Sequence, residues 1–104
     1  MNDLDILVQQ VKQSTDFQVN KKILNEKIKT DLHITYNNGL FLVTVELLAF
    51  LATWPEDELY LADTFENPIK INRTEFLSNC REQYQTVMNR WHLNYEELKK
   101  IRKI

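Results

Sequence analysis

Apolar residues recur at helical spacing through the last third of the chain, and they predict one long helix over residues 72–104. From Leu77 the apolar positions advance in steps of three and four, with Asn94 as the one polar interruption. This spacing is typical of the a and d positions of a coiled coil. Asn72, with Glu75 three residues later, is the expected N-cap. Two interpretations stay open: a helix packed on its own sheet, or a seam that also pairs with another chain.

The predicted helix is too long for a compact domain of this size. At about 1.5 Å per residue, a helix over residues 73–103 would be roughly 46 Å long. A compact chain of 104 residues should be about 33 Å across. We therefore expect either a break at residues 92–94, where helix propensity is weakest, or an overhang of about two turns. An overhang would expose Tyr95, Leu98 and Ile101 unless a partner covered them.

Alternating and turn-forming residues in the middle of the chain predict two β-hairpins. Residues 32–36 and 40–43 are the first pair of strands, joined by Asn-Asn-Gly at 37–39. Asn tolerates a left-handed conformation and Gly adopts it freely, which favours a tight turn. Residues 59–62 and 69–71 are the second pair, with a stretch rich in turn formers between them.

A second helix is predicted between the hairpins, over residues 45–54. Thr44 is its expected N-cap, and Pro55 ends it because proline disfavours helical geometry in the preceding residue. The segment is apolar nearly all round. We therefore expect it to be deeply buried or part of an interface, lying between the sheet and the long helix.

The N-terminal segment gives mixed signals. Residues 3–13 predict a short amphipathic helix, because several apolar side chains share one helical face. These side chains are Leu4, Leu7, Val8 and Val11. Residues 14–20 predict a loop or short strand, in which Phe17 and Val19 alternate with polar neighbours. Residues 20–29 are ambiguous between helix and irregular structure.

The combined prediction is a single α+β domain over residues 1–104, with the element order α-β-β-α-β-β-α. We expect a small, mainly antiparallel sheet of about four strands in two hairpins, with three helices over one face. The C-terminal helix is the longest.

Composition changes this picture little. The chain is 43% hydrophobic and 27% charged, which is ordinary for a globular protein. The single cysteine, Cys80, excludes an internal disulfide and suits a reducing compartment. We see no apolar run of membrane-spanning length, and residues 1–15 lack the apolar core of a signal peptide. We therefore expect a cytoplasmic protein with no membrane partner.

Charge is distributed unevenly around a net value of −2. Residues 31–69 hold seven acids and no Lys or Arg, so the remainder holds 13 basic residues against 15 − 7 = 8 acids. These charges either face solvent or steer association with a partner of complementary charge. An alternative function is that of a nucleic-acid-binding accessory factor, which would use the basic side chains. These are Lys21, Lys22, Lys27, Lys29, Lys99, Lys100, Arg102 and Lys103.

The sequence holds no recognisable catalytic motif. Cys80 lies on the apolar stripe of the long helix, which favours a buried structural thiol. His92 and Glu96 share one helical face, but zinc normally needs three or four protein ligands. The remaining candidates are turn carboxylates, which usually make local hydrogen bonds: Asp57, Asp63 and Glu66. We expect no enzyme activity, cofactor or metal.

Aromatic side chains indicate contact surfaces, because Trp and Tyr are enriched at interface hot spots. We predict a non-enzymatic interaction or assembly protein that self-associates through the outer part of the long helix, with a dimer favoured. The predicted contacts there are Trp91, Tyr95, Leu98 and Ile101. Phe65, at the tip of the second hairpin, is a further predicted contact.

Residues 39–101 carry a set of positions in a recognisable order. They are Gly39-x-Phe41-x-Val43, Glu46-Leu47-Leu48, Asn67-Pro68-Ile69-Lys70-Ile71, Phe76, Tyr84, Asn89-x-Trp91 and Tyr95-x-x-Leu98. This pattern resembles small uncharacterised proteins of T4-like marine bacteriophages. The resemblance implies a phage origin, a role in assembly or host interaction, and a location in the cytoplasm of the host cell. It implies no catalytic residues.

Overall fold

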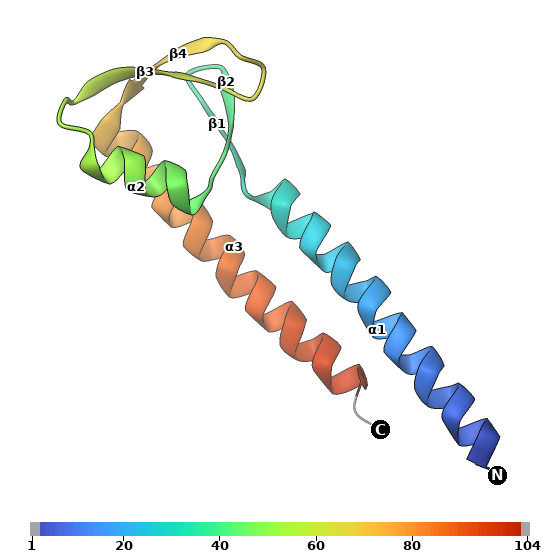
Figure 1. Cartoon of the computed structure of the whole chain (residues 1–104). Helices are drawn as coiled ribbons and strands as arrows, with labels where there is room; N and C mark the ends of the chain where they lie inside the picture. Colours follow the sequence, from blue (N-terminus) through green and yellow to red (C-terminus); the bar gives the residue numbers. More distant parts are fainter. Residues whose placement is uncertain (1–2, 103–104) are drawn as a thin grey trace.

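The computed structural model describes residues 3–102, with side chains to residue 100, and shows a small head attached to a two-helix arm (Figure 1). Its elements are α1 (Asp3–Asp31), β1 (His33–Tyr36), β2 (Gly39–Leu42), α2 (Val45–Thr53), β3 (Glu58–Ala62), β4 (Pro68–Asn72) and α3 (Arg73–Arg102). The predicted α+β class and element order are confirmed. The strands pair antiparallel as two two-stranded sheets, β1 with β2 and β3 with β4.

The N-terminal segment is one continuous helix, α1, of 29 residues. The prediction of a loop or strand at residues 14–20 is therefore wrong, and the ambiguous residues 20–29 are helical. Phe17 is buried and Val19 is exposed. Residues two apart in a helix point about 200° apart, so these two side chains occupy opposite faces. Their alternation comes from a helix with two apolar faces, not from a strand.

The arm is formed by α1 and the outer part of α3, which run antiparallel, so that the start of α1 and the end of α3 both lie far from the head (Figure 1). α3 continues through Asn94 without a break. The molecule measures 67 × 23 × 19 Å, and its radius of gyration is 19.8 Å, against about 13 Å for a compact chain of this length. The long helix therefore does overhang the head, and α1 of the same chain lies along the overhang.

The core of the head is centred on Phe76, in the first turns of α3. Its ring lies 4.8 Å from that of Tyr36 and 4.9 Å from that of Phe41, between centroids. Leu51, the one fully buried residue of α2, belongs to the same cluster. Because α3 reaches the strands directly, α2 packs beside it. The expectation that α2 lies between the sheet and the long helix is wrong.

Both predicted N-caps are confirmed. The Thr44 hydroxyl accepts a hydrogen bond from the Leu47 amide at 3.1 Å, at the start of α2. The Asn72 side chain accepts one from the Glu75 amide at 3.2 Å, at the start of α3. Each satisfies an amide that the first turn of a helix leaves unpaired.

The turn of the first hairpin is also confirmed, but with different roles for its residues. Asn37 and Asn38 have positive φ values of 46° and 67°, whereas Gly39 does not and is already the first residue of β2. A Cβ atom on Gly39 would lie 2.6 Å from Cγ1 of Ile69 and 2.9 Å from Cε2 of Phe41. Glycine is therefore required by the close approach of the second hairpin.

Candidate interaction surfaces

The contact residues predicted on α3 lie in the seam between α3 and α1. Trp91, Tyr95 and Leu98 are half-buried. The rings of Trp91 and Tyr95 stack with centroids 5.9 Å apart, and the Tyr95 ring lies 6.5 Å from that of Phe17 on α1. The side chain of Ile101 lies outside the described residues. The surface that we expected a partner to cover is thus largely covered within the chain.

The seam is apolar at its centre but includes polar positions. Phe17 and Ile28 of α1 are buried, as is Val87 of α3. The Oε1 atom of Gln13 is buried with no hydrogen-bond partner among the described residues. Asn94, the polar interruption seen in the sequence, is half-buried. Such positions lower the stability of the seam, because an unpaired buried carbonyl costs about 1–3 kcal/mol.

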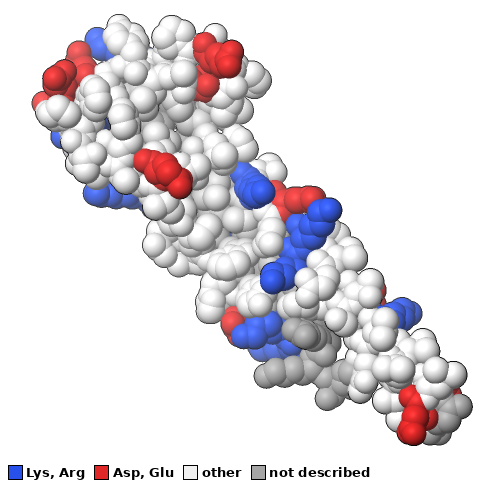
Figure 2. Space-filling view, viewed as in Figure 1, with Lys and Arg blue, Asp and Glu red and all other residues white. Residues whose placement is uncertain are grey.

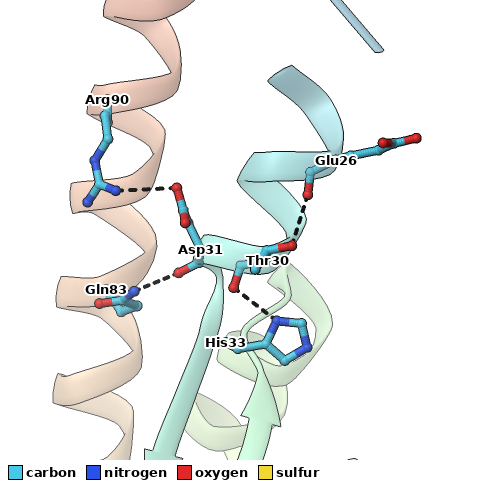
Figure 3. A network of polar contacts seen from close by, with 6 residues as sticks. All are labelled: Glu26, Thr30, Asp31, His33, Gln83 and Arg90. Carbon is cyan, nitrogen blue, oxygen red and sulfur yellow. Dashed lines mark hydrogen bonds and ion pairs between the residues drawn. The ribbon is translucent and has the colours of Figure 1, made fainter. Parts of the chain in front are cut away.

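At the head end of the arm, α3 holds the last residue of α1 through two side chains (Figure 3). Gln83 Nε2 donates to the backbone oxygen of Asp31 at 2.7 Å, and Arg90 Nη1 lies 3.3 Å from Asp31 Oδ2. His33 Nδ1 lies 3.1 Å from the Thr30 carbonyl oxygen. The Gln83 bond satisfies one of the carbonyls that the end of a helix leaves unpaired. This junction fixes α1 beside α3 where the first hairpin begins.

A second apolar face runs along α1 on the side away from α3. Val8 and Phe17 are nine residues apart, which is about two and a half turns, so they point in opposite directions. Six apolar side chains spread over about 160° around this side of the helix, and each is 52% to 65% exposed. We call them the outer stripe: Leu4, Leu7, Val8, Val11, Val19 and Ile23.

Sequence reasoning found only part of the outer stripe. It grouped Leu4, Leu7, Val8 and Val11 on one face, but it assigned Val19 and Ile23 to other segments. A search for two helical faces over residues 3–31 would have found both sets. The outer stripe is the largest set of exposed apolar side chains on one element of the described structure.

The tip of the second hairpin carries Phe65, whose side chain is 70% exposed, as expected for a loop contact. It borders a shallow pocket of about 340 Å³ between the two hairpin tips. Asn37, Asn38 and Asn67 line this pocket beside Phe65. The amides and the ring can contact a partner, but the pocket is open and too shallow to enclose a substrate.

Asp63, in the same pocket, links the two hairpins. Its carboxylate accepts hydrogen bonds from the backbone amides of Asn67 at 2.9 Å, Phe65 at 3.0 Å and Leu40 at 3.2 Å. The Asn67 amide contributes most to lowering the pKa of this carboxyl below its ordinary value. The expectation that turn carboxylates make local hydrogen bonds is confirmed for Asp63.

The basic residues of the nucleic-acid alternative are not gathered on one helical face. Lys22 and Lys27, five residues apart on α1, point about 140° away from each other. Lys99 and Lys100 lie nearer the chain end and pair with Glu96 and Glu97 at 3.4 Å. The side chain of Arg102 and the whole of Lys103 lie outside the described residues. Lys21 and Lys29 complete the set on α1.

The arm and the head differ in charge. Figure 2 shows Lys and Arg side chains over the middle of the arm, and acidic side chains over the head and at the N-terminal end of α1. Residues 32–80 contain seven acids and two basic residues, a balance of −5. With a net charge of −2 for the whole chain, the remaining residues carry −2 − (−5) = +3.

The side chains considered above for catalysis or metal binding are buried, exposed singly or paired with another side chain. Cys80 is fully buried, and burial raises the pKa of its thiol to about 11, so it is protonated at neutral pH. His92 is exposed, and its expected helical neighbour Glu96 pairs with Lys99. Among the described residues, no three His, Cys, Asp or Glu side chains group as metal ligands. Asp57 forms an exposed ion pair with Arg73 at 3.6 Å.

Comparison with known protein families, curated proteins and solved structures gives no significant match. Over the described residues, we find no helix with both the length and the apolar character needed to cross a membrane.

Proposed function

We propose that this chain is a non-enzymatic interaction protein that self-associates through its two-helix arm, in the cytoplasm. One observation supports this proposal: the outer stripe leaves six large apolar side chains of α1 half or more exposed. Four of them, Leu4, Val8, Val11 and Val19, lie within about 80° of one another around the helix. Exposed apolar side chains are common singly, but a continuous patch marks an interaction surface. The proposed surface is on α1, because the outer face of α3 is mostly polar and its seam residues pack on α1.

The stripe is large enough to support a weak dimer. Fully burying a Val, Leu or Ile side chain contributes about 1.5–3 kcal/mol, so covering the exposed part contributes roughly 1 kcal/mol for each. Two copies of a six-residue stripe then give about 12 kcal/mol before costs. The loss of translational and rotational freedom on association costs about 4–15 kcal/mol. A micromolar dissociation constant needs a net binding free energy of about 8 kcal/mol. At the low end of that cost about 8 kcal/mol remain, so a micromolar dissociation constant is the tightest that we expect.

Sedimentation equilibrium tests this proposal, with the intact chain measured from about 1 µM to about 1 mM. The test variant is Val8→Gln combined with Val11→Gln, in the middle of the apolar end of the stripe. Gln forms helices at least as well as Val, so α1 should remain folded while the apolar face is lost. We expect the dimer to weaken by at least tenfold.

Leu93→Gln is the matched control, because Leu93 is 65% exposed on α3, like Leu4 on the stripe, but lies on the other helix. It should leave the association constant unchanged. A wild-type chain that stays monomeric over the whole range would contradict the proposal. An equal loss from Leu93→Gln would show that the association surface is not the outer stripe.

A further inference from the structure

We infer that two copies of the chain pack antiparallel along their outer stripes, so that the two heads lie at opposite ends of the dimer. This inference rests on the proposed self-association and adds the identity of the occupant and its orientation. Three features support it: the charges along α1, the positions of the stripe residues and the charge of the head.

Charge changes sign along α1. Residues 3–10 contain two acids, Asp3 and Asp5, and no Lys or Arg. Residues 20–29 contain four lysines and one glutamate, a balance of 4 − 1 = +3. An antiparallel pair places the acidic end of each helix beside the basic end of the other, whereas a parallel pair places like charges together.

Four of the six stripe residues face one another in the antiparallel register. Leu4 and Ile23 mark the ends of the stripe, so a two-fold axis midway between them lies between residues 13 and 14. A two-fold contact is reciprocal, so each residue faces the one equally far beyond the axis. Leu4 then faces Ile23 of the other copy, and Val8 faces Val19. Asp5 faces Lys22 in the same register, whereas Leu7 faces Asn20 and Val11 faces Asp16.

The head gives an independent reason for this orientation. It carries a balance of −5 over residues 32–80, as counted above. A parallel dimer would hold two such heads side by side at one end. The antiparallel dimer separates them by the full overlapping length of the arms, so their repulsion becomes negligible in physiological salt, where screening acts over about 8 Å.

The two orientations differ in length. One chain is 67 Å long, and the axis lies about ten residues, or roughly 16 Å, from the free end of α1. An antiparallel dimer should therefore be roughly 100 Å long, and a parallel one roughly 70 Å.

Small-angle X-ray scattering tests this difference on the intact chain, at a concentration where sedimentation shows the dimer. A maximum dimension near 100 Å supports the inference. A dimer near 70 Å long would overturn it while leaving the proposed self-association in place. A chain that remains monomeric would overturn both.

Charge reversal provides a second test. Asp5→Lys and Lys22→Glu should each weaken the dimer about fourfold, because each disturbs two symmetric pairs. The combined variant should return to the wild-type affinity. Within one chain, Lys22→Glu places no acid in the first turns of α1, so it cannot restore an interaction that Asp5→Lys removes there. Recovery of affinity in the combined variant would therefore report contact between copies. A combined variant weaker than either single one would contradict the antiparallel register.

Discussion

Removing one aromatic ring should detach the outer half of α1 and leave the head folded. α1 packs along α3, and its buried apolar residues among those described are Phe17 and Ile28. Phe17 is 5% exposed and lies between the free end of the helix and Ile28. The helix N-terminal to it is anchored mainly by this side chain, so Phe17→Ala is the most direct perturbation of the arm.

The expected effect follows from the burial of the ring. Replacing a buried Phe by Ala costs about 3–5 kcal/mol. The whole chain is stabilised by about 5–15 kcal/mol, and an isolated helix of fewer than about 15 residues is marginal in water. We therefore expect local opening of residues 3–16 to become roughly a hundredfold or more easier. The core around Phe76 makes no contact with this segment and should keep its stability.

Native-state hydrogen exchange measures this outcome residue by residue, at a protein concentration low enough to keep the chain monomeric. Amides of residues 3–16 should exchange at least about a hundredfold faster in Phe17→Ala, with little change in β1 to β4. Val19→Ala is the matched control, because Val19 lies two positions away on the exposed face. An equal loss of protection in head and arm would refute the reasoning, since it would show that the two unfold as one unit.

Three further substitutions test other features of the fold. Gln13→Leu should raise the free energy of unfolding by about 1 kcal/mol in urea denaturation, because it removes a buried carbonyl oxygen that has no partner among the described residues. Gly39→Ala should lower that free energy by about 1–3 kcal/mol, because the added Cβ meets Ile69; an unchanged urea midpoint would contradict this. The pKa of Asp63 is lowered below 3.8, so its stabilising contribution is present above that pH and is lost as pH falls through the folded value. Asp63→Asn should therefore flatten the loss of stability below about pH 4, and equal acid sensitivity in both proteins would rule out this role.

The hairpins, α2 and the caps of α2 and α3 could be predicted because their signals are local. Thr44 and Asn72 each satisfy an amide three residues away, and the turn at Asn37 and Asn38 is set by residues with the required backbone freedom. The need for Gly39 could not be predicted fully, because the atoms that exclude a side chain there come from Ile69, thirty residues further along. Pairing of the strands within each hairpin was predictable, whereas the packing of one hairpin on the other was not.

The contact residues predicted on α3 lie in the seam with α1, and the association surface that we propose is therefore on α1. The a and d spacing from Cys80 to Leu98 does indicate a two-helix seam, and the structure contains one. Periodicity on α3 shows that a helix pairs there, but it carries no information about whether that helix belongs to the same chain. The nearest candidate, α1, had been divided into three segments, so it was not considered as the partner.

The apolar pattern that led α1 to be predicted as three segments also supports the proposed function. A helix that served only to cover α3 would need one apolar face, with polar residues on the other, and its period would be easy to recognise. α1 instead carries Phe17 and Ile28 on one side, and Val8, Val11 and Val19 on the other. Two opposite apolar faces cancel in any search for a single amphipathic face, and over a few residues they imitate the alternation of a strand. The second face does nothing for the folded monomer, since its side chains remain in water at a cost in solubility. A protein that keeps both faces on one helix therefore has the pattern expected when one face binds α3 and the other binds a second chain.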